Sequence, residues 1–247
     1  MIMKNRLKIR PNEFVPKSPK DMLGSTAKLA TAVLSHVLRL KAERRMSFKA
    51  CFYGPPGNGK TTIANLVAEA LAAHPMDIER RNGRDVTIEV VRDWQRGAAY
   101  ASMVGGWTVK IINEMDLMPM AAQDLMHDYL DTLKPGMAVL GTSKEQMDTL
   151  SARYMSRYQL IKVPVPAQVE IQRWLVKRWN LANHAAEWIA LGACGNVRSA
   201  LLQATTFQDL GVLPEARTVS VPSKCAARSE AAKRAWDTMR GGKAVAA

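Results

Sequence analysis

The sequence has few cysteines and no long apolar run. Its 247 residues include three cysteines, Cys51, Cys194 and Cys225, which lie far apart in the chain. This number and spacing argue against a disulfide framework or a zinc cluster. No stretch reaches the roughly 18 apolar residues of a membrane span, and the first twenty residues lack the apolar run of a secretory signal. The sequence therefore predicts a cytoplasmic protein with no membrane partner.

Acidic residues are scarce relative to basic ones. The chain has 35 lysines and arginines but only 22 aspartates and glutamates, which gives a formal net charge of +13. Such an excess suggests a polyanionic partner, most plausibly nucleic acid. The alternative is that the charge serves solubility alone.

A glycine-rich stretch at residues 54–62 fits the pattern G-x-x-x-x-G-K-[ST] of phosphate-binding loops. A short apolar run at 49–53 precedes it, and apolar residues at helical spacing follow it. Strand, glycine turn and helix form the context that this motif requires. The predicted nucleotide-binding residues are Gly54, Pro55, Pro56, Gly57, Asn58, Gly59, Lys60, Thr61 and Thr62.

The chemistry of this stretch suits a triphosphate with a magnesium ion. Glycines allow the backbone N–H groups to converge on an anion, and the N-terminus of the next helix adds positive potential. Lys60 would reach the β- and γ-phosphates, and the hydroxyl of Thr61 would bind Mg²⁺. We therefore expect ATP and Mg²⁺ as ligands.

A second run of β-branched residues, at 108–112, ends in Asn113 and Glu114. The carboxyl end of a central parallel strand faces the ligand in folds of this kind. Phosphoryl transfer needs one group to organise Mg²⁺ and another to align the attacking water. We assign these tasks to Asn113 and Glu114 respectively. A further strand ends at Thr142 and Ser143, whose hydroxyls either sense the γ-phosphate or cap the next helix.

Strands alternate with helices as far as residue 165, which predicts an α/β fold with a mostly parallel sheet. Strands are expected near 49–53, 76–81, 108–112, 137–143 and 159–163, and helices near 25–44, 62–73, 86–94, 119–133 and 146–157. Residues 1–20 read as a basic N-terminal arm. Residues 166–210 read as a helical lid whose tryptophans pack in its core, and 211–247 as a basic tail, partly disordered or helical.

Taken together, these motifs resemble those of AAA+ ATPases, and within them the clamp-loader subunits of the replication factor C small-subunit type. The resemblance runs from about residue 21 to 209. The segment with Met22 and Leu23 is similar to the one that covers the adenine. Asn113-Glu114-Met115-Asp116 is similar to the Walker B box, and Ser143 to the first sensor. The resemblance implies a five-stranded P-loop NTPase sheet with a small C-terminal helical lid, but without the collar domain of clamp loaders.

Two arginines carry roles implied by this resemblance. Ser156-Arg157-Tyr158 resembles the motif that supplies an arginine finger to a neighbouring subunit, with Arg153 as the substitute candidate. Arg198 resembles the second sensor in the lid. A finger of this kind contributes about 10³–10⁵ to the rate, so hydrolysis would depend on assembly.

The predicted function is an oligomeric AAA+ ATPase that acts on DNA in replication, recombination or a mobile element, alone or with other AAA+ subunits. The family usually has aspartate where Asn113 stands, so turnover is expected to be slow. Two alternatives remain open. One is a nucleotide-gated adaptor with little hydrolysis, and the other is a protein-remodelling motor whose candidate pore loop is 100–107.

Overall fold

The computed structural model describes residues 10–43, 46–98, 106–145 and 147–211. These residues divide into two compact units. The sheet unit spans residues 16–165, and the helical unit combines residues 10–15 with residues 166–211. The predictions for residues 1–9, for most of the candidate pore loop and for the tail from residue 212 onward lie outside the described residues.

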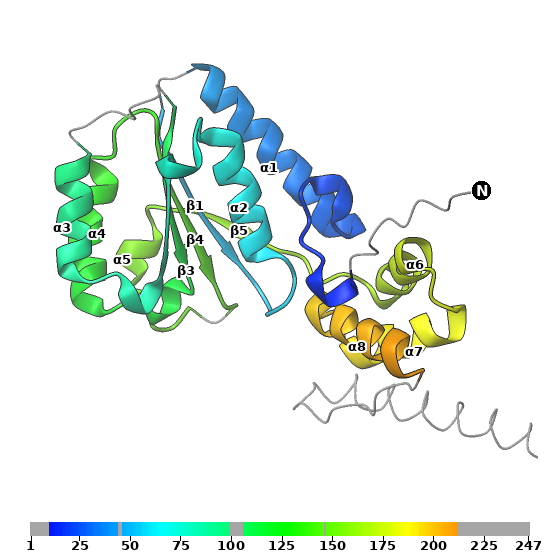
Figure 1. Cartoon of the computed structure of the whole chain (residues 1–247). Helices are drawn as coiled ribbons and strands as arrows, with labels where there is room; N and C mark the ends of the chain where they lie inside the picture. Colours follow the sequence, from blue (N-terminus) through cyan, green and yellow to red (C-terminus); the bar gives the residue numbers. More distant parts are fainter. Residues whose placement is uncertain (1–9, 44–45, 99–105, 146, 212–247) are drawn as a thin grey trace, which may run out of the picture. The chain divides into compact units, whose positions relative to one another are not determined.

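Five strands form the centre of the sheet unit. They are β1 (Phe48–Tyr53), β2 (Ile78–Asn82), β3 (Thr108–Asn113), β4 (Met137–Ser143) and β5 (Gln159–Lys162). Their order is β2-β3-β4-β1-β5, and every neighbouring pair is parallel (Figure 1). This confirms the predicted α/β fold with a five-stranded parallel sheet. All five carboxyl ends consequently meet at one edge of the sheet.

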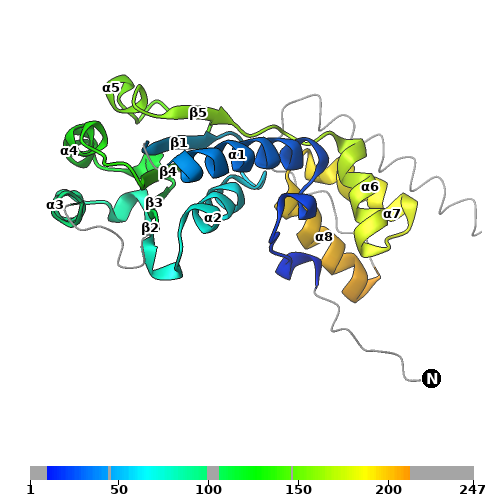
Figure 2. The same ribbon diagram turned by 90° about the horizontal axis from the view of Figure 1, so that it is seen from above.

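Helices cover both faces of this sheet (Figure 2). One face packs against α1 (Gly24–Glu43) and α2 (Lys60–Leu71), and the other against α3 (Ile88–Gly97), α4 (Met120–Asp131) and α5 (Ala152–Met155). The two-residue period of a strand explains the two layers. Ala50 and Phe52 belong to the α1–α2 layer, whereas Cys51 between them belongs to the α3–α5 layer.

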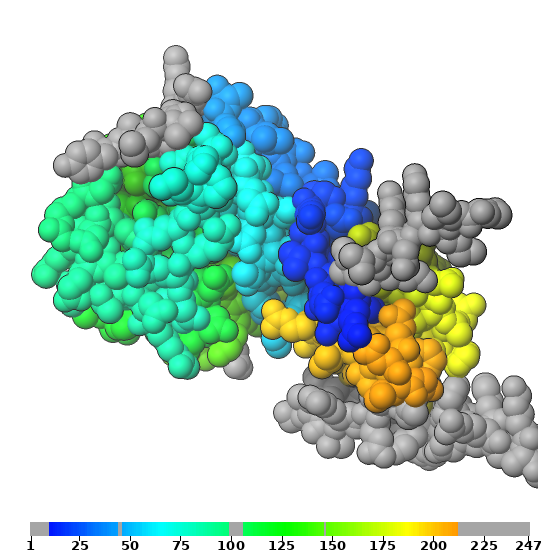
Figure 3. Space-filling view, in the orientation of Figure 1, coloured from blue at the N-terminus to red at the C-terminus, as the bar shows by residue number. Residues whose placement is uncertain are grey.

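The sheet itself is well covered. In the space-filling view, α2 and the segment from β2 to α3, coloured cyan to teal, hide most of the central strands (Figure 3). Val109, Ile111 and Ile112 of β3 and Val139 and Leu140 of β4 have no exposed surface. Central strands buried on both faces explain why the sequence shows continuous apolar runs rather than alternation.

The predicted helix at 146–157 is much shorter in the structure. Among its described residues, 147–157, only residues 152–155 form an α-helix, α5. The residues before it are held in another conformation by side chains, because Gln123 binds the carbonyl of Thr149 and the N–H of Ser151. These side-chain bonds satisfy backbone groups that a longer helix would have used. The prediction failed because the partner, Gln123, lies on a different helix.

The helical unit contains α6 (Gln168–Trp179), α7 (Asn183–Ala193) and α8 (Val197–Leu210). Residues 10–15 complete it. Phe14 packs edge-on against Trp179 with 5.5 Å between ring centroids, and the N–H of Asn12 donates to Thr205 Oγ1 at 3.0 Å. The predicted arm at 1–20 is therefore divided, since residues 10–15 fold with the helices and residues 16–20 with the sheet.

No helix in the described part of the chain combines the length and the apolar character needed to cross a bilayer.

Candidate functional site

The predicted phosphate loop connects β1 to α2 at the carboxyl edge of the sheet. Gly54 has φ 142°, and a Cβ there would press against the carbonyl oxygen of Val163 at 2.9 Å. Gly59 precedes α2 with φ 88° in the left-handed region. Both positions therefore require glycine. The loop thus runs directly into the N-terminus of a twelve-residue helix, where free N–H groups attract anions.

Lys60 is the first residue of α2, and its side chain folds back over the loop. Its Nζ donates to the carbonyl oxygens of Gly54 at 2.8 Å and Pro55 at 2.7 Å. The ammonium group therefore lies against the loop whose bound phosphates it would contact. Thr61, the predicted magnesium ligand, is exposed, and Thr62 is half-buried.

The segment before α1 lies against the same loop. Met22 and Leu23 are buried, and a Cβ on Gly59 would come within 2.9 Å of the terminal methyl group of Met22. The hydroxyl of Thr26 and the amide of Asn58 are buried and have no partner among the described residues. Buried polar atoms without partners cost free energy, which a bound ligand can recover. Glycine loop, helix N-terminus and unpaired polar groups together fit a nucleotide.

Polar side chains line up along the carboxyl edge of the sheet beside this loop. In the strand register, Asn82 at the end of β2 pairs with Asn113 at the end of β3. Ser143 at the end of β4 pairs with Tyr53, the residue before the phosphate loop. The predicted site residues Asn113 and Ser143 therefore share one edge of the sheet with the phosphate loop.

Glu114, at this edge, is held by contacts of both its backbone and its side chain. Its backbone is left-handed, with φ 51° and ψ 50°, and its N–H donates to Thr142 Oγ1 at 3.1 Å. Asn82 Nδ2 donates to Glu114 Oε2 at 3.2 Å. A Cβ on Gly83 would overlap the carbonyl oxygen of Glu114, so glycine is needed there for the two segments to approach. The carboxylate is exposed but its direction is set by Asn82.

Ser143 faces a different acid. Its Oγ donates to Asp116 Oδ1 at 3.4 Å, and Asp116 is buried with Lys144 Nζ 3.4 Å from its other oxygen. Thr142, rather than Ser143, bonds the backbone of Glu114. Sequence reasoning assigned no role in this site to Asn82 or to Asp116. For Asn82 a signal exists, since a polar residue followed by glycine ends a strand of the same parallel sheet.

The side chains predicted for magnesium offer neutral oxygens. Asn113 Oδ1 accepts a long bond of 3.5 Å from Thr142 Oγ1, and Thr61 offers its hydroxyl. Oxygen ligands suit Mg²⁺, which usually binds through one or two protein groups together with phosphates and waters. No cluster of three metal-binding acids, histidines or cysteines occurs in the described residues. The donor set therefore fits a metal that arrives with the nucleotide.

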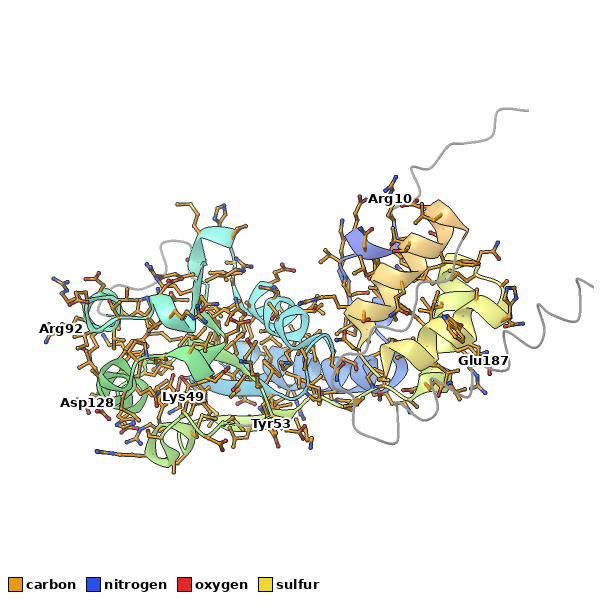
Figure 4. The ribbon with its side chains drawn as sticks, turned by 90° about the horizontal axis from the view of Figure 1, so that it is seen from below. Arg10, Lys49, Tyr53, Arg92, Asp128 and Glu187 are labelled. Atoms are coloured by element: carbon orange, nitrogen blue, oxygen red, sulfur yellow. The ribbon has the colours of Figure 1, made fainter. Side chains whose placement is uncertain are left out.

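Arg157, the predicted finger, lies at the opposite edge of the sheet. It comes two residues before Gln159, which pairs with Ala50 near the start of β1, whereas the phosphate loop follows the end of β1. Figure 4 labels Lys49 and Tyr53 near the two ends of this strand. A six-residue strand is about 20 Å long. The structure therefore does not bring Arg157 to the phosphate loop of its own chain.

Arg198 belongs to the helical unit. It is the second residue of α8 and is exposed. Asn196 is the N-cap just before this helix, and its side chain accepts from the N–H of Ser199 at 3.0 Å.

Comparison with known proteins shows similarity to ATPases. Residues 50–164 match the family described as ATPase family associated with various cellular activities (AAA). A 72-residue stretch is 38% identical to the Holliday junction branch migration complex subunit RuvB of Mesomycoplasma hyopneumoniae strain 7448, and strains J and 232 give the same match. That stretch covers 29% of this chain and 20% of the relative.

Solved structures show the same fold. The RuvB Holliday junction branch migration motor of Thermotoga maritima matches with a TM-score of 0.62 and 21% identity, over 79% of this chain and 65% of that chain. A mutant of the same protein matches with a TM-score of 0.64 over 87% of this chain and 72% of that one. The chain thus spans less than two thirds of the first of these structures. The relatives named are RuvB proteins, so the finer resemblance to clamp loaders stays a prediction.

Proposed function

Since residues 50–164 match the AAA ATPase family, we propose that this chain binds ATP, assembles with further copies or with related AAA+ subunits, and hydrolyses ATP while acting on DNA. The observation that carries the proposal is the edge of the sheet where the phosphate loop, Asn113, Glu114 and Ser143 meet. Its chemistry is that of phosphoryl transfer to water.

Each side chain at this edge has a separate task. The loop amides and the N-terminus of α2 bind the phosphates, and Lys60 leaves the loop carbonyls to contact the β- and γ-phosphates. Glu114 orients the attacking water and accepts its proton, with Asn82 holding the carboxylate. Thr61 and Asn113 would hold Mg²⁺, which neutralises charge on the phosphates when bound. Ser143 senses the γ-phosphate.

Besides Lys60, the proposed site takes a second cation, an arginine, from a neighbouring copy. Arg157 lies at the far edge of the sheet, so it serves the γ-phosphate of a neighbouring copy. A head-to-tail arrangement of copies joins one subunit's loop edge to the next subunit's arginine edge. The role of Arg198 at the γ-phosphate stays a prediction.

DNA is the proposed polyanionic partner. The net charge of +13 supports it, as does the likeness to proteins named for Holliday junction branch migration. Binding through phosphates releases counterions, so affinity should fall steeply with salt.

The decisive experiment mixes two inactive proteins. Lys60→Ala removes the loop cation, and Arg157→Ala removes the cation for the neighbour. If the site is shared, each variant alone is inactive, but their mixture regains ATP turnover at interfaces that combine an intact loop with an intact arginine. No recovery, with both variants still assembling in mass measurements, would show that Arg157 does not act across subunits.

The DNA half is tested separately, by measuring turnover and DNA binding at low and high salt. We expect turnover to rise with DNA and binding to weaken as salt rises. Equal turnover with and without DNA, together with no binding at low salt, would remove DNA from the proposal.

A second function is favoured by Asn113. With an amide in place of an acid, the site loses a negative charge near Mg²⁺, so the protein would act as a nucleotide-gated adaptor with slow turnover. Asn113→Asp decides between the two. A large gain in turnover supports the adaptor, whereas brisk turnover of the native protein removes it.

A further inference from the structure

The contacts of Arg157 are unusually complete for a surface arginine. Its Nε donates to Asp131 Oδ1 at 2.9 Å, and its Nη2 donates to Asp131 Oδ2 at 2.5 Å. Its Nη1 donates to the carbonyl oxygen of Arg153 at 2.7 Å. The guanidinium is therefore fixed by two bonds to a carboxylate and by a third bond to a carbonyl.

Arg157 keeps N–H groups that are not used by Asp131 or Arg153. A guanidinium has five N–H groups in a rigid fork, and the three bonds above leave one N–H on Nη1 and one on Nη2. Because Asp131 binds Nε and Nη2 side by side, the N–H left on Nη2 lies at the end of the fork, where it can donate to a phosphate oxygen. Asp131 thus occupies the side of the guanidinium and leaves its end for an anion.

Asp131 is the last member of a polar stripe on α4. Gln123, His127 and Asp131 are spaced four residues apart, so they share one face of the helix. Gln123 bonds the backbone ahead of α5. The ring of His127 packs 6.1 Å from that of Tyr154, and Asp131 binds Arg157. One helix face therefore holds the whole segment that carries Arg157.

Arg153 provides the contrast. It is exposed, and its guanidinium has no hydrogen bond or ion pair within the described chain, although it lies only four residues before Arg157. Arg157 retains 19% of its side-chain surface. Two neighbouring arginines thus differ in whether a carboxylate fixes their direction.

We propose that Asp131 is a positioning residue that holds Arg157 in the orientation needed to receive the γ-phosphate of a neighbouring copy. The inference rests on the proposed function, since it assumes that Arg157 acts across subunits. A long arginine side chain loses rotamer freedom when it binds. The ion pair with Asp131 orders the Arg157 side chain before the phosphate binds. Binding of the phosphate then costs less conformational entropy.

The experiment compares Asp131→Asn with Asp128→Asn by steady-state turnover at saturating ATP, together with a mass measurement of assembly. Asp128 lies on the same helix and is exposed (Figure 4). Within the described residues its side chain forms no hydrogen bond or ion pair with Arg157. Asp128→Asn therefore removes the same charge from the helix but leaves the ion pair between Asp131 and Arg157 intact. We expect Asp131→Asn to lower kcat about two- to tenfold, with KM for ATP and assembly unchanged. Asp131→Glu should recover part of the loss, and Asp128→Asn should match the native protein.

Several outcomes would overturn the inference. These are an unchanged or higher kcat in Asp131→Asn, a loss of assembly in that variant, or an equal loss of kcat in Asp128→Asn. Arg157→Ala separates this failure from that of the proposed function. If Arg157→Ala abolishes turnover while Asp131→Asn does not change it, only the positioning role is wrong. If Arg157→Ala keeps the native rate, the shared site itself is wrong.

Discussion

The two faces of the sheet differ in what is buried against them. Against the α1–α2 face the buried side chains are almost all apolar, such as Ile63, Val67 and Leu71. Against the α3–α5 face lie buried polar groups as well, among them Gln123 and His127. Apolar packing is non-directional, whereas hydrogen bonds fix direction. The first face therefore supports the phosphate loop through apolar packing, and the second face fixes the direction of individual polar side chains.

The tyrosines of the second face show this directional character. Tyr154 and Tyr158 flank the end of α5, and their hydroxyls are 2.8 Å apart in the interior. Burial raises the pKa of both phenols, so both stay protonated and able to share this bond. Since Arg157 lies between them in sequence, the pair anchors the backbone from which it projects. Changes on the two faces should accordingly have different consequences.

The largest effect is expected on the first face. Leu71→Ala removes a fully buried side chain at the end of α2, and should lower the free energy of unfolding by about 2–5 kcal/mol. Denaturant unfolding measures this loss, with Leu38→Ala as control, because Leu38 is 52% exposed on α1. ATP affinity of the folded fraction should not change. A loss as small as that of the control would contradict the close packing assigned to this face.

Lys60→Ala changes a polar group on the same face of the sheet. We expect it to lower ATP affinity without lowering stability. Hydrogen bonds to charged groups contribute about 1.5–3 kcal/mol, so ATP affinity should fall about 10- to 100-fold with the unfolding free energy nearly unchanged. Calorimetric titration with ATP measures it. Lys41→Ala is the matched control, because Lys41 Nζ also binds a backbone carbonyl, that of Ala70, at 2.7 Å. Native affinity in Lys60→Ala would remove the phosphate-loop assignment.

Asn82→Ala tests whether a polar contact at the sheet edge orients rather than stabilises. Without Asn82 the carboxylate of Glu114 loses its donor, and turnover should fall about three- to tenfold, since the group is exposed and the bond is weakened by solvent. ATP affinity should stay at the native value. Asn65→Ala serves as control, because Asn65 accepts a bond from Arg80 at the surface. A loss of affinity instead of rate would mean that Asn82 contacts the nucleotide.

The contrast between the faces also explains what the sequence could predict. The five strands, the phosphate loop and the helices of the helical unit follow from apolar periodicity and glycine spacing, which are local signals. The shortened helix α5 and the pairing of Arg157 with Asp131 depend on side chains that come from α4. Such contacts between distant segments leave no periodic trace in the chain. Asn82 stands between these cases, since its place at a strand end is local but its bond to Glu114 is not.

The smallest effect is expected from an ion-pair cluster between β2, β3 and α3. Burial alone would raise the pKa of Glu79, but hydrogen bonds from Lys110, Arg81 and Trp94 outweigh it and lower the pKa from 4.5 to about 2. Because the unfolded chain binds this proton more readily, the cluster stabilises the fold above pH 4.5 and loses its contribution as the pH falls toward 2. The contribution is about 1 kcal/mol, since the group is partly exposed and screened.

Glu79→Gln isolates this contribution. The native protein should exceed the variant in unfolding free energy at neutral pH, and the difference should shrink to nothing between pH 4.5 and 2. Glu69→Gln is the control, because Glu69 is exposed on α2 and its side chain forms no ion pair within the described residues. A difference that stays constant with pH would show that Glu79 acts by packing, and would make this part of the second face resemble the first.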